Sequence, residues 1–338
     1  MQVTRLQDIA EKLNITKVAV SKALNDHKDI SVDLKNRVKQ LAIEMGYVPN
    51  HLAKNFKSKK SFTIGVLVPN ITNSYFAKIV TGIIEYCSQQ GYTPVILISN
   101  EDTHTELSNI EKLLSLRVDG FLICITKHSD NDQLLALINK IKLPIVFFDR
   151  VPDGINLSSI SSNQEKAAYD TVHFLITKGY QKFAFINGPE FLDISKKRFQ
   201  GFFNALNNAK LATNKEWIKQ GELSKDSGEQ ACIEILSGTV QPEILFCIND
   251  EVAYGAYKAI YNKGLKIPQD IGVLAFGHQE FANYLLPTLS IIEQYPQELG
   301  FESAKMLLNH IQFKENIDII RYFKTSFIPG NSLLIPKL

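Results

Sequence analysis

The strongest constraint on the fold of this chain is an alternation of short apolar runs with longer segments of helical periodicity, which begins near residue 63. The apolar runs are four to six residues long, and the segments between them carry apolar residues three or four positions apart. Strands buried on both faces have this continuous apolar character, so the pattern predicts a parallel sheet covered by helices on both faces. In the first half of this region we expect strands at residues 63–68, 95–98, 120–124 and 144–148, with helices at 76–87, 107–114 and 134–141.

The same alternation restarts after about residue 163, with strands expected at residues 182–186, 244–248 and 271–276 and helices at 167–177, 199–207 and 253–262. Two successive α/β halves predict two similar lobes with a cleft between them. Open α/β sheets bind ligands beyond the carboxyl ends of their strands. The candidate ligand contacts are therefore the residues that follow expected strands: 73–76, Asp149, Arg150, Asp250, Glu251, Gly277 and His278.

The first sixty residues follow a different pattern, with two short helical segments joined by a tight turn and a third segment after them. Thr16 is placed to cap the second helix, whose expected buried positions are Val20 and Leu24. Two such helices cannot close a core alone, so a third helix around Val38 completes a small bundle. This layout presents the second helix outward, as in helix-turn-helix proteins that read the major groove.

The basic residues of the chain are concentrated in this N-terminal segment. Residues 1–60 contain twelve Lys and Arg against six Asp and Glu, a net charge of +6, whereas the whole chain carries +2. A basic excess at one end is typical of a protein that holds a polyanion by neutralising its phosphates. The alternative is a solvated helical cap on an enzyme, with the charges clustered by chance.

Length, hydropathy and cysteine spacing limit the class of protein. A chain of 338 residues suffices for two or three compact units, and no apolar run approaches the length needed to span a bilayer. Arg5, Asp8 and Glu11 lie where a secretory signal would be apolar. We therefore expect a cytoplasmic protein with no membrane partner. The four cysteines lie far apart in apolar segments, which predicts buried free thiols: Cys87, Cys124, Cys232 and Cys247.

The motifs of common enzyme classes are missing from the sequence. No GxGxxG follows the first strand, and neither a Walker A motif nor a GxSxG elbow is present. The histidines are scattered without metal-binding spacing. Asp149, Asp193 and Asp250 are possible acid–base groups, but sugar-binding pockets use carboxylates equally well as hydroxyl acceptors. The sequence therefore indicates a protein that is not an enzyme and has no metal or cofactor.

Motifs spread over the whole chain resemble those of the LacI/GalR family of transcription regulators. The most specific ones lie in the head, at residues 8–10, Thr16, residues 20–25 and the Gly-Tyr-Val-Pro-Asn segment 46–50. Weaker motifs follow in the same order along the body, at residues 64–66, 118–120, 148–150, 179–180, 198–202, 249–250 and 287–289 with Gln294. The resemblance implies an N-terminal all-α helix-turn-helix head and an α/β two-lobed sensor domain of the periplasmic-binding-protein type, with parallel sheets covered by helices.

The family resemblance also implies which residues of the second helix contact DNA. Lys17, Val18 and Lys22 would meet base edges in the major groove, where lysine can donate to guanine and valine can contact a thymine methyl. Thr16, Ser21 and Asn25 are better placed for phosphates. Simple helix capping and surface polarity are the alternative roles for Ser21 and Asn25.

The segment after the bundle resembles the family's hinge helix, which is too short to be stable alone in water. The resemblance implies that two copies of this segment order on DNA and enter the minor groove with an apolar wedge. Family members usually have leucine at the wedge, and this chain has Phe56. The hinge residues expected to contact DNA are Asn50, Ala53, Lys54, Phe56 and Lys57.

In the body, the resemblance implies a small effector in the cleft, contacted by Asn73, Tyr75, Phe76, Arg198 and Asp250. Phe76 also begins the apolar face of its helix, so a core role is its alternative. Asp149 is expected either to bind the effector or to cap the next turn.

The chain departs from the family after its expected strand 271–276. Family members usually carry an aspartate there that reaches the ligand, whereas this chain has Gly277 and then His278. His278 can donate to or accept from a ligand, and its alternative is a solvent-facing loop residue. The effector class of better-known relatives therefore does not transfer directly.

Together these features predict a cytoplasmic repressor that binds palindromic operator DNA as a homodimer and senses a sugar or sugar derivative. We expect a DNA-binding domain at residues 1–47, a hinge and linker at 48–61 and an effector-binding and dimerisation domain at 62–338. Its N-lobe would comprise residues 62–162 and 293–326, and its C-lobe 163–291 and 327–338. The rival predictions are a solute-binding protein without a DNA role and a cytoplasmic α/β enzyme with a helical appendage.

Overall fold

The computed structural model of the chain describes residues 4–47, 60–72, 74–127, 129, 131–152, 157–313 and 319–334. The chain divides into two compact units, Met1–Ser61 and Phe62–Leu338, which we call the head and the body. Within the described residues, no helix is long and apolar enough to cross a membrane.

The head is a bundle of three helices, α1 (Leu6–Leu13), α2 (Lys17–Leu24) and α3 (Val32–Glu44). Its core consists of small and branched side chains from all three helices: Ile9, Ala10, Val20, Ala23, Val38 and Ala42. The Thr16 hydroxyl accepts the Ala19 N–H at 3.1 Å, which confirms the expected cap of α2. The expected burial of Leu24 was wrong in degree: Ala23 is the buried residue one position earlier, and Leu24 is only half-buried.

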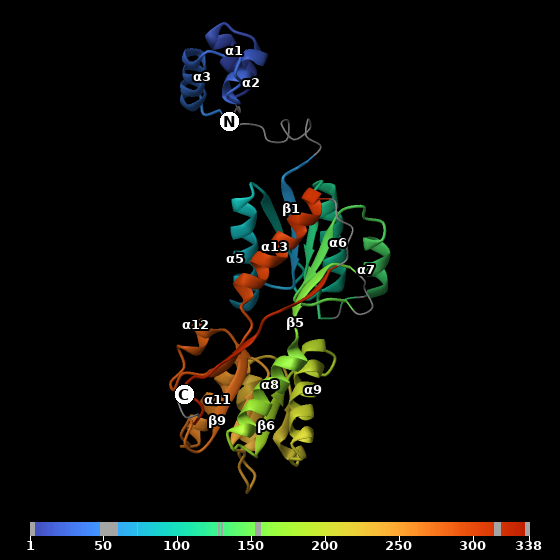
Figure 1. Cartoon of the computed structure of the whole chain (residues 1–338), viewed down its shortest axis with the longest axis vertical. Coiled ribbons are helices and arrows are strands. Elements are labelled where there is room, and N and C mark those ends of the chain that lie inside the picture. The colour runs from blue at the N-terminus through green and yellow to red at the C-terminus, as the bar shows by residue number, and fades with distance from the viewer. Residues whose placement is uncertain are drawn as a thin grey trace. The chain divides into compact units, whose positions relative to one another are not determined.

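The first lobe of the body is a doubly wound α/β sandwich (Figure 1). Its sheet has the strand order β11-β5-β4-β3-β1-β2, and every described pairing in it is parallel. The strands are β1 (Thr63–Val68), β2 (Thr93–Ile98), β3 (Phe121–Ile123), β4 (Ile145–Phe148), β5 (Ser159–Ser162) and β11 (Ile320–Phe323). Helices α5 (Ser74–Gln89) and α13 (Pro296–Phe313) pack on one face, and α6 (Thr103–Ser115) and α7 (Asn131–Ile138) on the other.

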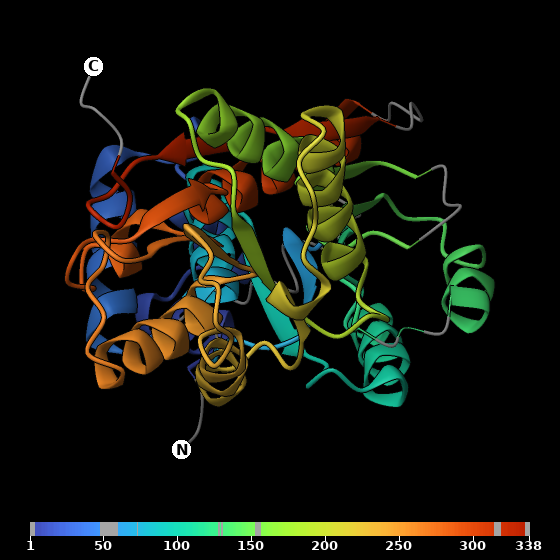
Figure 2. The ribbon, with the colours of Figure 1, turned by 90° about the horizontal axis from the view of Figure 1, so that it is seen from below.

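The second lobe repeats this plan with the strand order β12-β10-β9-β8-β6-β7. Figure 2 shows its helices in two layers, and the core clusters place α8 and α9 on one face of the sheet and α10 and α11 on the other. Its strands are β6 (Phe183–Asn187), β7 (Ile218–Gln220), β8 (Ile244–Cys247), β9 (Gly272–Gly277), β10 (Ser290–Glu293) and β12 (Ser326–Ile328). Its helices are α8 (Gln164–Thr177), α9 (Asp193–Asn208), η1 (Lys215–Trp217), α10 (Lys225–Ile235), α11 (Asp250–Asn262) and α12 (Gln279–Ala282).

The chain passes between the two lobes at three places: between β5 and α8, between β10 and α13, and between β11 and β12. These crossings bring the carboxyl ends of the strands in both sheets toward the junction of the lobes. The residues that follow β1, β4, β8 and β9 are therefore available to one shared cleft.

The sheets depart from the pattern seen in the sequence in two details. The second sheet is not wholly parallel, because β12 pairs antiparallel with β10. The strands are also not all apolar, because β5 reads Ser-Ile-Ser-Ser. Its hydrogen bonds to β4 on one side and β11 on the other hold it in the sheet, although serine has no strong preference for strands.

The expected burial of the thiols is confirmed, since Cys87, Cys124, Cys232 and Cys247 are all buried and free.

Candidate functional site

A small cavity of about 80 Å³ lies between the two lobes at the carboxyl ends of their strands. It adjoins a second cavity of about 200 Å³ through the shared residues Asp149, Arg150 and Ile194. The two spaces are parts of the body's cleft. The inner cavity gathers six of the residues expected from the sequence as effector contacts: Tyr75, Phe76, Asp149, Arg198, Asp250 and His278.

Tyr75 and Asp149 form a buried polar pair on the wall of the first lobe. The Tyr75 hydroxyl donates to Asp149 Oδ1 at 2.7 Å. Asp149 directly follows β4 and has φ of 58°, a left-handed conformation that Asp tolerates better than most residues. Burial raises the pKa of the Asp149 carboxyl, and burial together with that carboxylate raises the pKa of the Tyr75 hydroxyl. Asp149 therefore offers the cavity an acceptor with little competing solvent.

Arg198, on α9, lies on the wall of the cleft formed by the second lobe, and its guanidinium donates three hydrogen bonds. Its Nε donates to Gln164 Oε1 and its Nη2 to Gln294 Oε1, each at 2.9 Å, and its Nη1 donates to the Ile248 carbonyl. The guanidinium carbon lies 3.8 Å from the centre of the Phe276 ring. Burial lowers the pKa of Arg198 to about 10, so the group stays charged at neutral pH. Three of its five N–H groups are used, which leaves two for a ligand.

Asp250 is the first residue of α11, separated from the end of β8 by two residues, and also faces the inner cavity. Burial, followed by the repulsion of Glu251, raises the pKa of the Asp250 carboxyl to about 6. Gly277 is next to it: a Cβ at position 277 would lie 3.1 Å from the Asp250 Cβ. Asp250 therefore occupies much of the space that a side chain at position 277 would need.

The raised pKa of Asp250 gives a stability prediction. The folded protein holds the proton up to about pH 6, and the unfolded chain releases it near pH 3.8, so the charged carboxylate costs stability above pH 6. We expect Asp250→Asn to raise the melting temperature of the ligand-free protein by about 2–4 °C at pH 8. The gain should fade as the pH drops from 6 toward 4. Thermal unfolding of both proteins across this range is the measurement, and a gain independent of pH would contradict the assignment.

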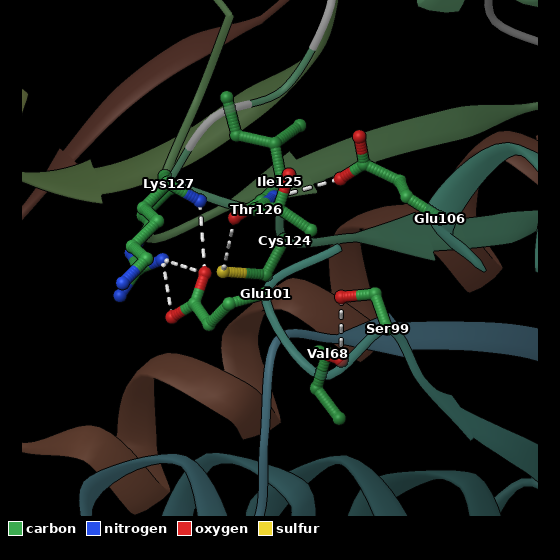
Figure 3. A network of polar contacts seen from close by, with 9 residues as sticks. Val68, Ser99, Glu101, Glu106, Cys124, Ile125, Thr126 and Lys127 are labelled. Carbon is green, nitrogen blue, oxygen red and sulfur yellow. Dashed lines mark hydrogen bonds and ion pairs between the residues drawn. The ribbon is translucent and has the colours of Figure 1, made fainter. Parts of the chain in front are cut away.

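A network of charged and polar groups supports the rim of the cleft (Figure 3). Arg150 Nη1 lies 3.0 Å from each carboxylate oxygen of Glu101 and donates to both. Glu101 Oε2 also accepts the Lys127 backbone N–H at 2.8 Å. The buried Glu106 accepts the Thr126 N–H at 2.7 Å and the Ser129 hydroxyl at 2.6 Å. The two carboxylates thus fix the loop after β3 by its backbone, and Arg150 in turn lies 5.3 Å from the centre of the Phe76 ring.

His278 follows β9 and is only 6% exposed, so its expected alternative as a solvent-facing residue was wrong. Its Nδ1 accepts the Phe281 N–H at 3.2 Å, and its Nε2 lies 2.9 Å from the Ser74 hydroxyl of the first lobe. Burial, and then the charge of Lys78, lower the pKa of the imidazole.

Phe76 has both of its expected environments, because it packs in the core of the first lobe and lines the cavity. Asn73 lies outside the described residues.

Sequence reasoning did not assign several residues that line the same cavity. Arg150 was expected only as a residue that follows a strand, Gln294 was noted within a motif but given no role, and Phe276 was only a strand residue. Ile194 and Leu223 carried no signal, since both lie in loops or helix starts that the apolar pattern does not mark. Gln164 holds Arg198 from the start of α8, a helix whose beginning was expected three residues later.

On the head, α2 presents the residues expected to meet DNA. Lys17 and Val18 are exposed at its first turn, with Val18 64% exposed. Lys22 is half-buried and forms an ion pair with Asp29. The Asn25 amide donates to the Ser21 carbonyl at 2.7 Å, so its side chain caps the end of its own helix. The hinge residues Asn50, Ala53, Lys54, Phe56 and Lys57 lie outside the described residues.

Among the residues that the structure describes, no group of three or more His, Cys, Asp or Glu side chains could hold a metal ion.

Comparison with known families assigns both units of the chain. The family described as bacterial regulatory proteins, lacI family, matches residues 5–50. The family described as periplasmic binding proteins and sugar binding domain of LacI family matches residues 61–327. The two matches cover the head and most of the body.

Curated relatives align along almost the entire chain. The ribose operon repressor of Haemophilus influenzae is 32% identical over 308 residues, which cover 91% of this chain and 92% of the relative. The HTH-type transcriptional repressor PurR of Aliivibrio fischeri (strain MJ11) is 32% identical over 314 residues, which cover 92% and 93%.

Solved structures share the fold at lower identity. The lac repressor dimer bound to operator and the anti-inducer ONPF superposes with a TM-score of 0.88 at 24% identity, over 99% of this chain and 100% of that one. The transcriptional regulator CelR–cellobiose complex superposes with a TM-score of 0.72 at 22% identity, over 97% and 99%.

Proposed function

This chain belongs to the LacI family of bacterial regulatory proteins, and from that premise we propose that it is a DNA-binding transcriptional repressor controlled by a sugar or sugar derivative. The sugar binds in the cleft of the body, and the protein acts as a homodimer on a palindromic operator in the cytoplasm. The regulatory head separates this chain from a solute-binding protein. Its curated relatives are transcriptional repressors, in agreement with a protein that is not an enzyme.

The observation that carries the DNA-binding proposal is the exposed first turn of α2. The core of the head holds α2 by Val20 and Ala23, on the face opposite to the solvent. Lys17 and Val18 are left free of that core, where they can reach base edges. We propose that Thr16 and Ser21 contact phosphates, and that Lys22 contacts a base after exchanging its pairing with Asp29. The hinge residues Asn50, Ala53, Lys54, Phe56 and Lys57 remain proposals based on the sequence.

The chemistry of the cleft favours a ligand that carries hydroxyl groups and no net charge. Asp149 and Asp250 face the inner cavity as acceptors, and Arg198 has two N–H groups to donate. Phe76 and Phe276 supply apolar surface for the face of a sugar ring. Because Arg198 and Arg150 are already engaged by polar partners within the body, the inner cavity is not built around a strongly anionic group. We infer a neutral sugar, contacted by Tyr75, Phe76, Asp149, Arg198 and Asp250.

Regulation follows from the two-lobed body. A ligand that contacts both walls of the cleft binds the closed arrangement of the lobes more tightly than the open one, and so shifts the population toward closure. Two of the three crossings lie beside cleft residues: Gln164 begins α8 at one, and Gln294 directly follows β10 at another. We propose that closure in each copy of the dimer changes the placement of the first lobes and thereby the affinity for the operator.

Selection of DNA from a random pool by the full-length protein tests the proposal. We expect enrichment of a palindromic duplex, bound at physiological salt at least 1,000-fold more tightly than its scrambled counterpart. Lys17→Ala and Val18→Ala should each weaken binding to the enriched duplex about 10-fold and change binding to scrambled DNA far less.

Lys140→Ala is the matched control, because Lys140 is an exposed lysine of the body and should have no effect. Equal affinity of the wild-type protein for enriched and scrambled duplexes would refute a sequence-specific regulator. Equal losses on both duplexes in the two head variants would refute base contacts by Lys17 and Val18.

A further inference from the structure

Two side-chain contacts join helix α5 of the first lobe to the start of α12 in the second. The first is the Ser74 Oγ to His278 Nε2 distance of 2.9 Å. The second is the ion pair between Lys78 and Glu280. Ser74 and Lys78 are four residues apart on α5, so they lie on one face of that helix. His278 and Glu280 are correspondingly the cap and the second residue of α12.

The hydrogen bonds of His278 fix the direction of its contact with Ser74. Nδ1 accepts the Phe281 N–H at 3.2 Å, so it carries no proton. The proton of the neutral ring is therefore on Nε2, which donates to the Ser74 hydroxyl oxygen. This tautomer caps α12 and bridges the lobes at the same time, and the doubly protonated ring cannot do both.

Helix α12 is also tied to the crossing between the lobes. The buried Glu293, the last residue of β10, accepts the Gln279 N–H at 2.6 Å. Its other oxygen accepts the N–H groups of Gln294 and Tyr295, each at 2.9 Å. Gln294 in turn holds Arg198 in the cleft. A displacement of α12 is thus linked by hydrogen bonds to the chain crossing and to the ligand pocket.

We propose that Ser74, Lys78, His278 and Glu280 form a latch that holds the two lobes closed, and that His278 regulates the cleft through the lobe arrangement rather than by contacting the effector. The latch deepens the regulation proposed above and rests on that function for its purpose, although the lobe arrangement itself can be measured without DNA or effector. Opening the latch frees α12 from α5 and favours the open arrangement.

Single-molecule energy transfer in the full-length protein tests the latch without any ligand. Dyes on Leu116→Cys and Tyr261→Cys report the arrangement of the lobes, because both positions are exposed and lie in different lobes. The four native cysteines are buried and should not be labelled. Labelled protein is mixed with an excess of unlabelled protein, so that transfer between copies does not contribute.

Four variants separate the latch from mere packing. Ser74→Ala removes the acceptor, and His278→Asn keeps an acceptor for the Phe281 N–H while it removes the bridge. Lys78→Glu and Glu280→Lys break the ion pair, and their combination restores it with reversed charges. We expect each single variant to lower the ratio of closed to open molecules about 2- to 10-fold, and the charge-swapped pair to recover it.

The matched control is the Lys258–Glu229 ion pair, which joins α11 and α10 within one lobe at 2.7 Å. Breaking it by Lys258→Glu should leave the ratio unchanged. A ratio that is also unchanged in Ser74→Ala and His278→Asn overturns the latch, whatever the DNA experiments show. Failure of DNA selection with a normal latch response would overturn only the proposed function.

Acidification gives an independent test. Lys78 on α5, Glu280 on α12, Glu293 on β10 and Asp250 on α11 are the charged groups around His278, and Asp250 titrates near pH 6. The test therefore uses the Asp250→Asn background. Lowering the pH from 8 to 5 should open the lobes there, and His278→Asn should remove that response. Opening that persists in His278→Asn assigns it to another group and contradicts the latch.

Discussion

Arg198→Ala should abolish the response of the protein to its effector while DNA binding in the absence of effector persists. The substitution removes two N–H groups available to a ligand. It also leaves the Gln164 and Gln294 oxygens and the Ile248 carbonyl without their shared donor. Loss of a charge-assisted contact to a ligand typically costs a factor of 10–100 in affinity, and the loosened pocket adds to it. We expect a loss of at least 100-fold in effector affinity.

The measurement begins with a thermal-shift screen of neutral sugars, headed by D-ribose, against the full-length protein, because a ligand that binds only the native state raises its melting temperature. The sugar with the largest shift is then titrated into the operator complex. Arg321→Ala serves as the matched control, since Arg321 is half-exposed on β11 and pairs with Glu302 away from the cleft. An Arg198→Ala protein that responds at the wild-type sugar concentration would refute the assignment.

Folding of the variant must be established separately, because the Gln164 oxygen and the Ile248 carbonyl lose the Arg198 donor and the Gln294 oxygen keeps only the Gln164 amide. We expect Arg198→Ala to be less stable by about 2–4 kcal/mol and still folded. Arg198→Lys keeps the charge but loses the fork that reaches two amides and a carbonyl. It should therefore restore part of the stability and little of the effector response. If Arg198→Lys responded to the effector as the wild-type protein does, the role of Arg198 would be to supply a positive charge alone.

The doubly wound lobes could be predicted from the sequence because their central strands are buried on both faces. Within β1, Val66 faces the cluster formed with α5 and α13, whereas its neighbour Leu67 faces α6 and α7. A strand with two apolar environments must be a continuous apolar run, and such runs are visible in the sequence. The edge strand β11 is largely exposed and β5 is rich in serine, so neither leaves this signal.

The location of the candidate site could be predicted from the expected fold, but the hydrogen-bond partners of its side chains could not. The strand-end rule placed Asp149 and Asp250 at one cleft, and the structure brings them to the same cavity. It gave no indication that Tyr75 would donate to Asp149, because their contact depends on the left-handed backbone at position 149. The partners of Arg198 come from the start of α8, the residue after β8 and the crossing after β10, and only the relative placement of these three segments determines them.

Gly82→Ala should be the most destabilising small substitution in the first lobe. A Cβ at position 82 would lie 1.9 Å from the Gln297 carbonyl oxygen and 2.8 Å from the Phe301 nitrogen, both of them backbone atoms of α13. Gly300 makes the reciprocal approach, with its Cβ position 2.0 Å from the Ile79 carbonyl oxygen of α5. The two glycines therefore allow α5 and α13 to touch backbone to backbone, and a methyl group at either position must separate the helices.

The sign of this effect distinguishes packing from helix propensity. In an unconstrained helix, Gly→Ala stabilises by about 1 kcal/mol, so any loss at position 82 is steric. We expect Gly82→Ala to lower the free energy of unfolding by about 3 kcal/mol or more. The same separation should weaken effector binding, because α5 carries Tyr75 and Phe76 and α13 begins two residues after Gln294.

Urea denaturation of the full-length protein measures the loss in stability. Gly238→Ala is the matched control, since its Cβ would make only ordinary contacts at 3.7 Å, and it should change stability by less than about 0.5 kcal/mol. A Gly82→Ala protein as stable as the wild type would show that α13 can move away from α5 at no cost. The lobe would then be too compliant to transmit closure of the cleft, and the proposed regulation would lose its mechanical basis.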